Sequence, residues 1–158
     1  MAARKILVLG ATGFLGSYVM ERFEQAWGVE VKGVGSVECD LIASALGMVD
    51  SFAPDSIIHL AATCGGIGVN REQPGRFLYD NAKMALNVIE AARACGVKKV
   101  VMVGSVCQYP ENTPAPFKEE DLWNGYPEPT NAPYGIAKRL GMEMLKAYHQ
   151  QYGMSGIF

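Results

Sequence analysis

The 158-residue sequence predicts an α/β fold with a doubly wound parallel sheet. Short apolar runs alternate with longer segments of helical periodicity along the whole chain. A glycine-rich turn, GATGFLG, joins the first apolar run to the first helical segment. Strands that alternate with helices form parallel βαβ units with right-handed crossovers, which place helices on both faces of one sheet. The length suits one domain of this kind, at residues 1–158.

About six strands are expected, and the last of them begins close to the end of the sequence. The first is a short run of apolar residues that is stopped by a glycine. The expected strands are residues 5–10, 29–34, 37–41, 56–62 and 98–105, with a sixth that begins at 154.

Three helices are expected between these strands. The first, over residues 14–27, carries apolar residues at helical spacing. The second covers 73–95 and is followed by Gly96, a residue type that commonly ends helices. The third has Pro133 in its first turn and runs to about residue 151.

A proline-rich segment precedes the last helix. Six of the eight prolines lie between residues 110 and 133. A linker between domains is one interpretation of this composition. Trp123 and Tyr126 are unlike linker residues, so we predict an ordered loop, a kind of segment that often carries function.

Composition excludes several classes of function. The net charge is −2 and no basic cluster occurs, which argues against a nucleic acid partner. No apolar stretch approaches the length needed to span a membrane, and the basic, then apolar start reads as a strand rather than a signal peptide. The four cysteines form no C-x-x-C pair, so neither a metal site nor a disulfide framework is expected. The simplest setting is a reducing cytoplasm.

The glycine loop predicts a dinucleotide site. Gly10, Gly13 and Gly16 would allow a tight turn, close approach of a pyrophosphate and close packing of helix on strand. The following helix offers free N–H groups to the phosphates. A loop that follows a strand and opens a helix is typical of Rossmann-type dinucleotide-binding folds. A glycine-rich turn without a ligand is the alternative.

The sequence leaves the choice between NAD and NADP open. In such folds an acidic residue at the end of the second strand often binds the ribose 2′-hydroxyl. Here Val34, Gly35 and Ser36 stand in that place, with neither a carboxylate nor an arginine, and Lys32 is the nearest cation. The absence of the acid favours NADP, and NAD remains the alternative.

The segment YGIAK places Tyr134 and Lys138 on one face of a helix. A lysine ammonium beside a phenol is expected to lower the pKa of the phenol. The tyrosine could then act as an acid or base near neutral pH. Ser105 stands at the end of the fifth strand and can donate to the same substrate oxygen. With the glycine loop, these residues resemble the short-chain dehydrogenase/reductase superfamily. HLAA at residues 59–62 and Asn81 match its extended branch, whose members mostly act on nucleotide sugars.

Within that branch, three segments resemble the GDP-L-fucose synthase family. They are GSVCQYP at 104–110, CGGIGVN at 64–70 and EPTNAPYGIAKRLGM at 128–142. The resemblance runs from about Ile6 to Ile157. It implies a bifunctional epimerase and reductase, which inverts C3 and C5 of GDP-4-keto-6-deoxy-D-mannose and then reduces the C4 ketone with NADPH.

The resemblance also implies the residues of the site. The family's active-site cysteine falls on Cys107, which would exchange protons next to the ketone. Ser105 and Tyr134, with Lys138 beside them, would serve the ketone oxygen. A small buried hydrophobic residue is the alternative role for Cys107. The implied cofactor contacts are Gly10, Thr12, Gly13, Phe14, Leu15, Gly16, Asp40, Leu41, Leu60, Ala61, Ala62, Asn81 and Lys138, and the implied substrate contacts are Gly66, Asn70 and Ser105.

The sequence departs from the family pattern in three respects. The family's second catalytic partner, a histidine, and most residues that hold the GDP-sugar lie beyond the sixth strand, outside this sequence. Val106 replaces a small polar residue, and the family's arginines after the second strand are missing. We therefore expect an N-terminal, cofactor-binding portion whose C-terminal substrate domain is missing.

Two other functions remain open. The first is another nucleotide-sugar epimerase or dehydratase of the same branch, and a 4-epimerase would not require Cys107. A non-catalytic nucleotide-binding or dimerising module is the second. The helices near 73–95 and 133–151 carry apolar residues on more than one side. In the extended branch these helices pair across a two-fold axis, which implies a homodimer unless one subunit covers both faces itself.

Overall fold

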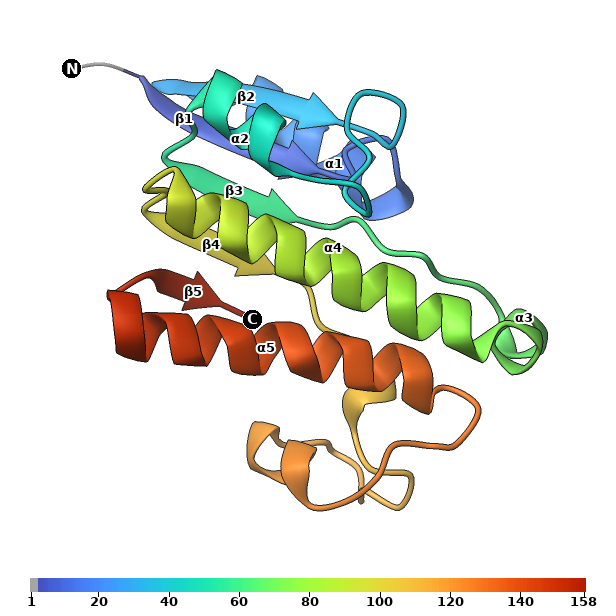
Figure 1. Ribbon diagram of the computed structural model, residues 1–158. Coiled ribbons are helices and arrows are strands. Elements are labelled where there is room, and N and C mark those ends of the chain that lie inside the picture. The colour runs from blue at the N-terminus through green and yellow to red at the C-terminus, as the bar shows by residue number, and fades with distance from the viewer. Residues whose placement is uncertain (1–2) are drawn as a thin grey trace.

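The computed structural model describes residues 3–158 and contains a five-stranded sheet in the order β2-β1-β3-β4-β5 (Figure 1). All four pairs of neighbouring strands are parallel. This order confirms the predicted doubly wound parallel fold, because the chain moves outward from β1 in both directions. The strands are β1 (Arg4–Leu9), β2 (Val29–Val34), β3 (Ser56–His59), β4 (Lys99–Met102) and β5 (Ser155–Ile157).

Helices cover both faces of the sheet. The first helix packs on one face, and the two long helices lie side by side on the other (Figure 1). The helices are α1 (Phe14–Glu24), α2 (Leu46–Phe52), α3 (Ile67–Glu72), α4 (Pro74–Ala94) and α5 (Ala132–Tyr152), with two short 3₁₀ helices, η1 (Val106–Gln108) and η2 (Glu119–Trp123). Within residues 3–158, no helix combines the length and the apolar character needed to cross a membrane.

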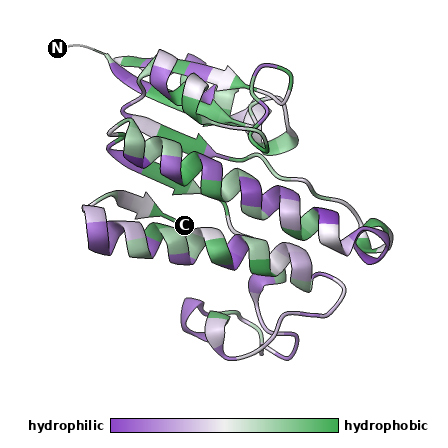
Figure 2. Ribbon diagram, viewed as in Figure 1, coloured by the Kyte–Doolittle hydropathy of each residue, from purple (hydrophilic) through white to green (hydrophobic). Residues whose placement is uncertain are grey.

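Alternation along β1 divides its side chains between two cores. Leu7 and Leu9 pack in the core that contains residues of α4 and α5, whereas Ile6 and Val8 pack against α1. Figure 2 shows the hydrophobic residues of β3 and β4 beneath α4. A parallel strand buried on both faces reads as a continuous apolar run, which explains why β1 is visible in the sequence.

The prediction of a strand at residues 37–41 is wrong, and the sheet has five strands. The Gly35 amide donates to the Glu38 carboxylate at 2.8 Å, and the Cys39 amide donates to the Gly35 carbonyl at 3.0 Å. These bonds close a turn directly after β2 and use main-chain groups that a further strand would need. The predicted sixth strand is β5.

The three predicted helices are confirmed as α1, α4 and α5. The sequence analysis did not predict α2 and α3, which have seven and six residues. Helices this short span less than two full turns, so they leave little periodic signal. They lie between residues 41 and 56 and between residues 62 and 73, where no element was predicted.

The proline-rich segment is an ordered loop, as predicted. An antiparallel bridge joins Pro110 and Pro127, and the Glu111 amide donates to the Tyr126 carbonyl at 3.1 Å. Within the loop, the rings of Tyr109 and Phe117 stack with their centroids 4.9 Å apart. The loop is thereby closed on itself between β4 and α5.

Candidate active site

The glycine loop lies at the carboxyl end of β1, at the edge of the sheet where ligands bind in open α/β folds. Gly10 has a positive φ of 84°, and a Cβ there would lie 2.6 Å from the Ala61 amide nitrogen. A side chain at Gly16 would collide with the Gly10 carbonyl. Gly13 is the N-cap of α1, and no side chain caps the first amides of this helix. The loop therefore presents main-chain donors, which suit dinucleotide phosphates.

A cavity of about 350 Å³ opens beside this loop. It is lined by the segments that follow β1, β2 and β3 and by residues of α4. The predicted cofactor residues in its lining are Gly10, Asp40, Leu41, Ala61 and Ala62. The other predicted cofactor residues lie outside its lining: Thr12, Gly13, Phe14, Leu15, Gly16, Leu60, Asn81 and Lys138.

Two charged residues that the sequence analysis missed lie at this edge. Arg76 lines the cavity and pairs with Asp80 at 3.4 Å. Glu38 stands at the end of β2, where its carboxylate accepts from the Gly35 amide. An acid was expected directly after the strand, whereas the turn brings back Glu38 from four residues beyond Val34. A search extended through the following turn would have found it.

Two predicted ligand-binding asparagines hold the loop between β3 and α4. Asn81 accepts from the Thr63 amide at 3.1 Å and donates to the Thr63 carbonyl at 2.8 Å. Asn70 donates to the carbonyls of Gly65 and Gly66 at 3.1 and 3.2 Å. Gly66 is also the N-cap of α3. These side chains shape the loop, and their contacts with cofactor or substrate stay predictions.

Ser105 and Cys107 lie on a turn that follows β4. Ser105 caps η1: its Oγ accepts from the Cys107 amide at 3.2 Å, and Gln108 Oε1 accepts from the Ser105 amide at 2.6 Å. This reciprocal capping box turns the chain sharply at the end of the strand. Because Ser105 Oγ is an acceptor within the turn, its O–H group is left to donate elsewhere.

The N-terminal part of α5 brings Tyr134 and Lys138 to this turn. The close approach depends on Gly135, where a Cβ would collide with the Cys107 carbonyl. Lys138 is buried, and its Nζ donates to the Val103 carbonyl at 3.2 Å. The same Nζ lies 5.7 Å from the centroid of the Tyr134 ring. The structure therefore brings the four predicted catalytic residues together.

The prediction that Lys138 lowers the pKa of Tyr134 is wrong in this structure. Burial, followed by negative charge on Cys64 and Cys107, raises the pKa of Tyr134 to about 12. Burial lowers the pKa of Lys138, whose ammonium binds a carbonyl rather than the phenol. Desolvation of the phenol is the largest cause of this shift, and Lys138 is not among its causes. Tyr134 is protonated at neutral pH and is suited to donate a proton.

Cys64 is a neighbour of the site that the sequence analysis did not assign. It is exposed, and its thiolate form raises the pKa values of both Tyr134 and Lys138. The strand register could have suggested this position. His59 is paired with Met102, and Cys64 and Cys107 each stand five residues beyond these partners.

The two histidines do not supply a free acid or base at this edge. His59 is buried in β3, where burial and then the charge of Lys138 lower its pKa to about 3. His149 Nδ1 lies 3.1 Å from the Met154 carbonyl, near the far end of α5. Across the described part of the chain, no group of three or more His, Cys, Asp or Glu side chains could hold a metal ion.

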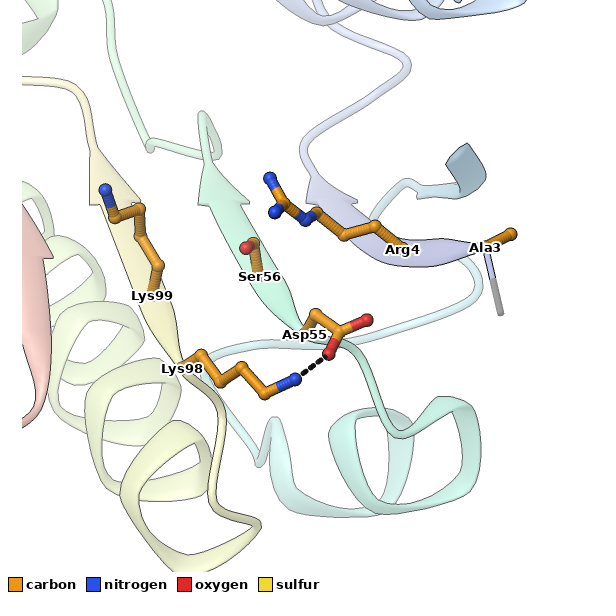
Figure 3. Close-up of a pocket in the computed structure, with 6 residues that line it drawn as sticks. All are labelled: Ala3, Arg4, Asp55, Ser56, Lys98 and Lys99. Atoms are coloured by element: carbon orange, nitrogen blue, oxygen red, sulfur yellow. Dashed lines mark hydrogen bonds and ion pairs between the residues drawn. The ribbon is translucent and has the colours of Figure 1, made fainter. Parts of the chain in front are cut away.

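A separate cavity of about 490 Å³ lies at the opposite edge of the sheet, near the beginnings of β1, β3 and β4 (Figure 3). Arg4, Lys98 and Lys99 line it, and Lys98 pairs with Asp55 at 2.6 Å. The cavity is open and lies away from the carboxyl ends of the strands, so it takes no part in the candidate active site.

The parallel sheet, the glycine loop and the grouping of Ser105, Tyr134 and Lys138 are the architecture of the short-chain dehydrogenase/reductase class. Within this class the chain belongs to the NAD dependent epimerase/dehydratase family, whose profile matches residues 6–158. The resemblance inferred from the motifs is thereby confirmed for the family.

Individual relatives agree with this membership. The chain is 36% identical to the GDP-L-fucose synthase of Escherichia coli (strain K12) over 156 residues, which are 97% of this chain and 48% of that protein. Its structure is similar to the GDP-mannoheptose C4 reductase from Campylobacter jejuni with NADP bound, with a TM-score of 0.92, 30% identity and coverage of 99% of this chain and 50% of that one. A GDP-L-fucose synthetase from Naegleria fowleri bound to NADP gives a TM-score of 0.83 and 30% identity, with coverage of 100% and 52%. The chain spans about half the length of the curated relatives it matches.

Proposed function

We propose that residues 1–158 form the dinucleotide-binding domain of a nucleotide-sugar epimerase/reductase, with NADP as the cofactor and NAD as the alternative. The observation that carries this proposal is the convergence of Ser105, Cys107, Tyr134 and Lys138 at the same end of the parallel sheet as the glycine loop. The substrate that suits this set is GDP-4-keto-6-deoxy-D-mannose, converted to GDP-L-fucose. The identity to GDP-L-fucose synthases supports this choice.

The residues present fit a dinucleotide. Glycines keep side chains out of the space above β1, and the uncapped amides of α1 suit a pyrophosphate. When bound, NADPH supplies the hydride for reduction at C4. Sugar contacts at Gly66 and Asn70 belong to this proposal.

Each catalytic group has a role that follows from its environment. Tyr134, protonated at neutral pH, donates its proton to the C4 oxygen during reduction. Ser105 donates its free O–H to the same oxygen and stabilises the enolate during epimerisation. The Cys107 thiol exchanges the proton next to the ketone, and the buried Lys138 charge orients the cofactor ribose beside Tyr134.

We also propose that the chain forms a homodimer through α4 and α5. A shallow groove of about 510 Å³ runs along these helices and is mostly apolar. Its lining includes Leu86, Trp123, Ile136, Leu140 and Met144. Leu140→Glu should halve the mass measured by light scattering, whereas Lys146→Glu should not. A monomeric wild type at every concentration would contradict this assignment.

We place the protein in the cytoplasm, a setting that suits its four free cysteines.

The first test is a fluorescence titration of the 158-residue chain with NADPH and NADH. Saturable binding is expected, and the tighter ligand identifies the cofactor. Failure to bind either would contradict a dinucleotide-binding domain. A turnover assay with GDP-4-keto-6-deoxy-D-mannose then tests the reaction. It is carried out with this chain and with a longer protein that contains this chain and has the full length of the relatives.

A second nucleotide-sugar enzyme of the same family is the main alternative. A 4-epimerase would not depend on Cys107, so a silent Cys107→Ser substitution in a turnover assay would favour it. Cofactor binding and dimerisation without any turnover would favour a non-catalytic module.

A further inference from the structure

Arg139 is a buried cation that the roles above leave unused. It follows Lys138 on α5 and is 8% exposed. Among residues 3–158, no carboxylate lies within ion-pair distance of it. Removal of a guanidinium from water is costly unless its N–H groups find acceptors. The hydrogen bonds of the Arg139 guanidinium must therefore offset the cost of its burial.

The guanidinium joins three segments of the chain. Its Nε donates to the Gln108 carbonyl at 2.7 Å, and its Nη1 donates to the Gly125 carbonyl at 3.0 Å. The ring of Trp123 lies 5.2 Å from the guanidinium carbon. Gln108 ends the turn that carries Ser105 and Cys107, whereas Gly125 belongs to the proline-rich loop. Arg139 thus ties α5 to both.

Only an arginine suits this double contact. Its planar fork presents several donors in a fixed geometry, so it reaches two carbonyls from two different segments at once. A lysine at this position would offer one nitrogen on a flexible stem. An apolar side chain would leave the buried Gln108 carbonyl without this donor.

Two consecutive residues of α5 hold the two ends of the segment that carries Ser105 and Cys107. Lys138 binds the Val103 carbonyl before the turn, and Arg139 binds the Gln108 carbonyl at its end. Between these points the capping box fixes the turn internally. The segment is therefore clamped onto the helix that carries Tyr134.

We propose that Arg139 is a positioning residue of the candidate active site. Through the Gln108 carbonyl it fixes the turn that bears Ser105 and Cys107 against the helix that bears Tyr134 and Lys138. The inference rests on the proposed function only in that these four groups are the reacting ones. The clamp, defined as the hydrogen bonds of Lys138 and Arg139 to the two ends of this segment, does not depend on the proposed function.

The reactivity of the Cys107 thiol reports on the clamp. In a Cys64→Ser background, the rates of alkylation by iodoacetamide are measured for each cysteine by peptide mass spectrometry between pH 6 and 9. Cys39 and Cys95 serve as internal references for global loosening. The variants are Arg139→Met and Arg139→Lys, and Lys146→Met is the control, an exposed cation on the same helix.

Arg139→Met should accelerate alkylation of Cys107 roughly fivefold across this pH range, because the turn opens locally. Cys39 and Cys95 should keep their rates. Arg139→Lys should give an intermediate rate, and Lys146→Met should match the wild type. If Arg139→Met fails to fold, Arg139→Lys carries the test with an expected acceleration of about twofold.

An unchanged Cys107 rate in the folded variants would overturn the inference, even if their Tm fell. Equal acceleration of all three cysteines would also overturn it, since Arg139 would then serve only general stability. The NADPH titration of the unsubstituted chain tests the proposed function separately. The two proposals can therefore fail independently of each other.

Discussion

The glycine loop and the catalytic turn meet at the same edge of the sheet, yet they are built in opposite ways. The loop from Gly10 to Gly16 depends on missing side chains and main-chain contacts, and the residue that opens α1, Phe14, is 84% exposed. The catalytic turn is held by side chains, including the buried Gln108 and Arg139. Added side-chain atoms should therefore disrupt the loop, whereas removal of side-chain atoms should disrupt the turn.

The largest effect is expected from Gly16→Val. Its side chain would collide with the Gly10 carbonyl, so the loop must shift away from its compact form. NADPH affinity should fall by more than about tenfold in a fluorescence titration. Gly47→Val is the matched control, because a Cβ at this position in α2 would meet no atom within 4 Å and Gly47 lies outside the cavity lining. Equal affinities for the two variants would show that the packing of this loop does not govern binding.

Burial of His59 predicts that the free energy of unfolding falls in acid. The pKa of His59 is lowered to about 3 by burial and by the charge of Lys138, from about 6.5 in an unfolded chain. A lowered pKa means that the unfolded state binds the proton first. The stabilising effect is complete above about pH 6.5 and is lost as the pH falls toward 3.

His59→Leu should remove this dependence. Between pH 7 and pH 5, the wild type should lose about 2 kcal/mol more free energy of unfolding than the variant. Urea unfolding at both pH values measures the difference. His149→Gln, at an exposed histidine near the end of α5, should behave like the wild type. Parallel losses in the wild type and His59→Leu would assign the acid sensitivity to other groups.

Lys138→Met tests whether the catalytic side contributes to cofactor binding. The variant removes a buried ammonium that lies near Tyr134 and binds the Val103 carbonyl. NADPH affinity should fall about tenfold, with Lys146→Met as the exposed control. An unchanged affinity would mean that the glycine loop alone determines binding.

The same contrast explains what the sequence could predict. The glycine loop and the Tyr134–Lys138 pair are local patterns, because spacing along the chain already fixes their geometry. The buried strand β1 was visible for the same reason. These features sufficed for the fold and for the grouping of the catalytic residues.

The contacts that escaped prediction join distant parts of the chain. Arg139 reaches Gln108 across 31 positions, and no sequence spacing marks that pair. The turn after β2 resembled a strand because its residues alternate in polarity, whereas the Glu38 carboxylate closes it. The pKa of Tyr134 depends on burial, which the YGIAK spacing does not reveal.

The smallest expected effect concerns the choice of cofactor at the glycine-loop edge. The Glu38 carboxylate binds the Gly35 amide and stands at the end of β2, the place from which this class of fold contacts the adenine ribose. Glu38→Gln keeps an acceptor for the Gly35 amide and removes the negative charge. Because a carboxylate repels a 2′-phosphate, the ratio of NADPH to NADH affinity should rise about threefold. Glu30→Gln, near the start of β2 and paired with Lys5, should leave the ratio unchanged. If both variants keep the wild-type ratio, Glu38 acts only to close the turn, and the cofactor preference is determined elsewhere in the cavity, where Arg76 is the cation that lines it.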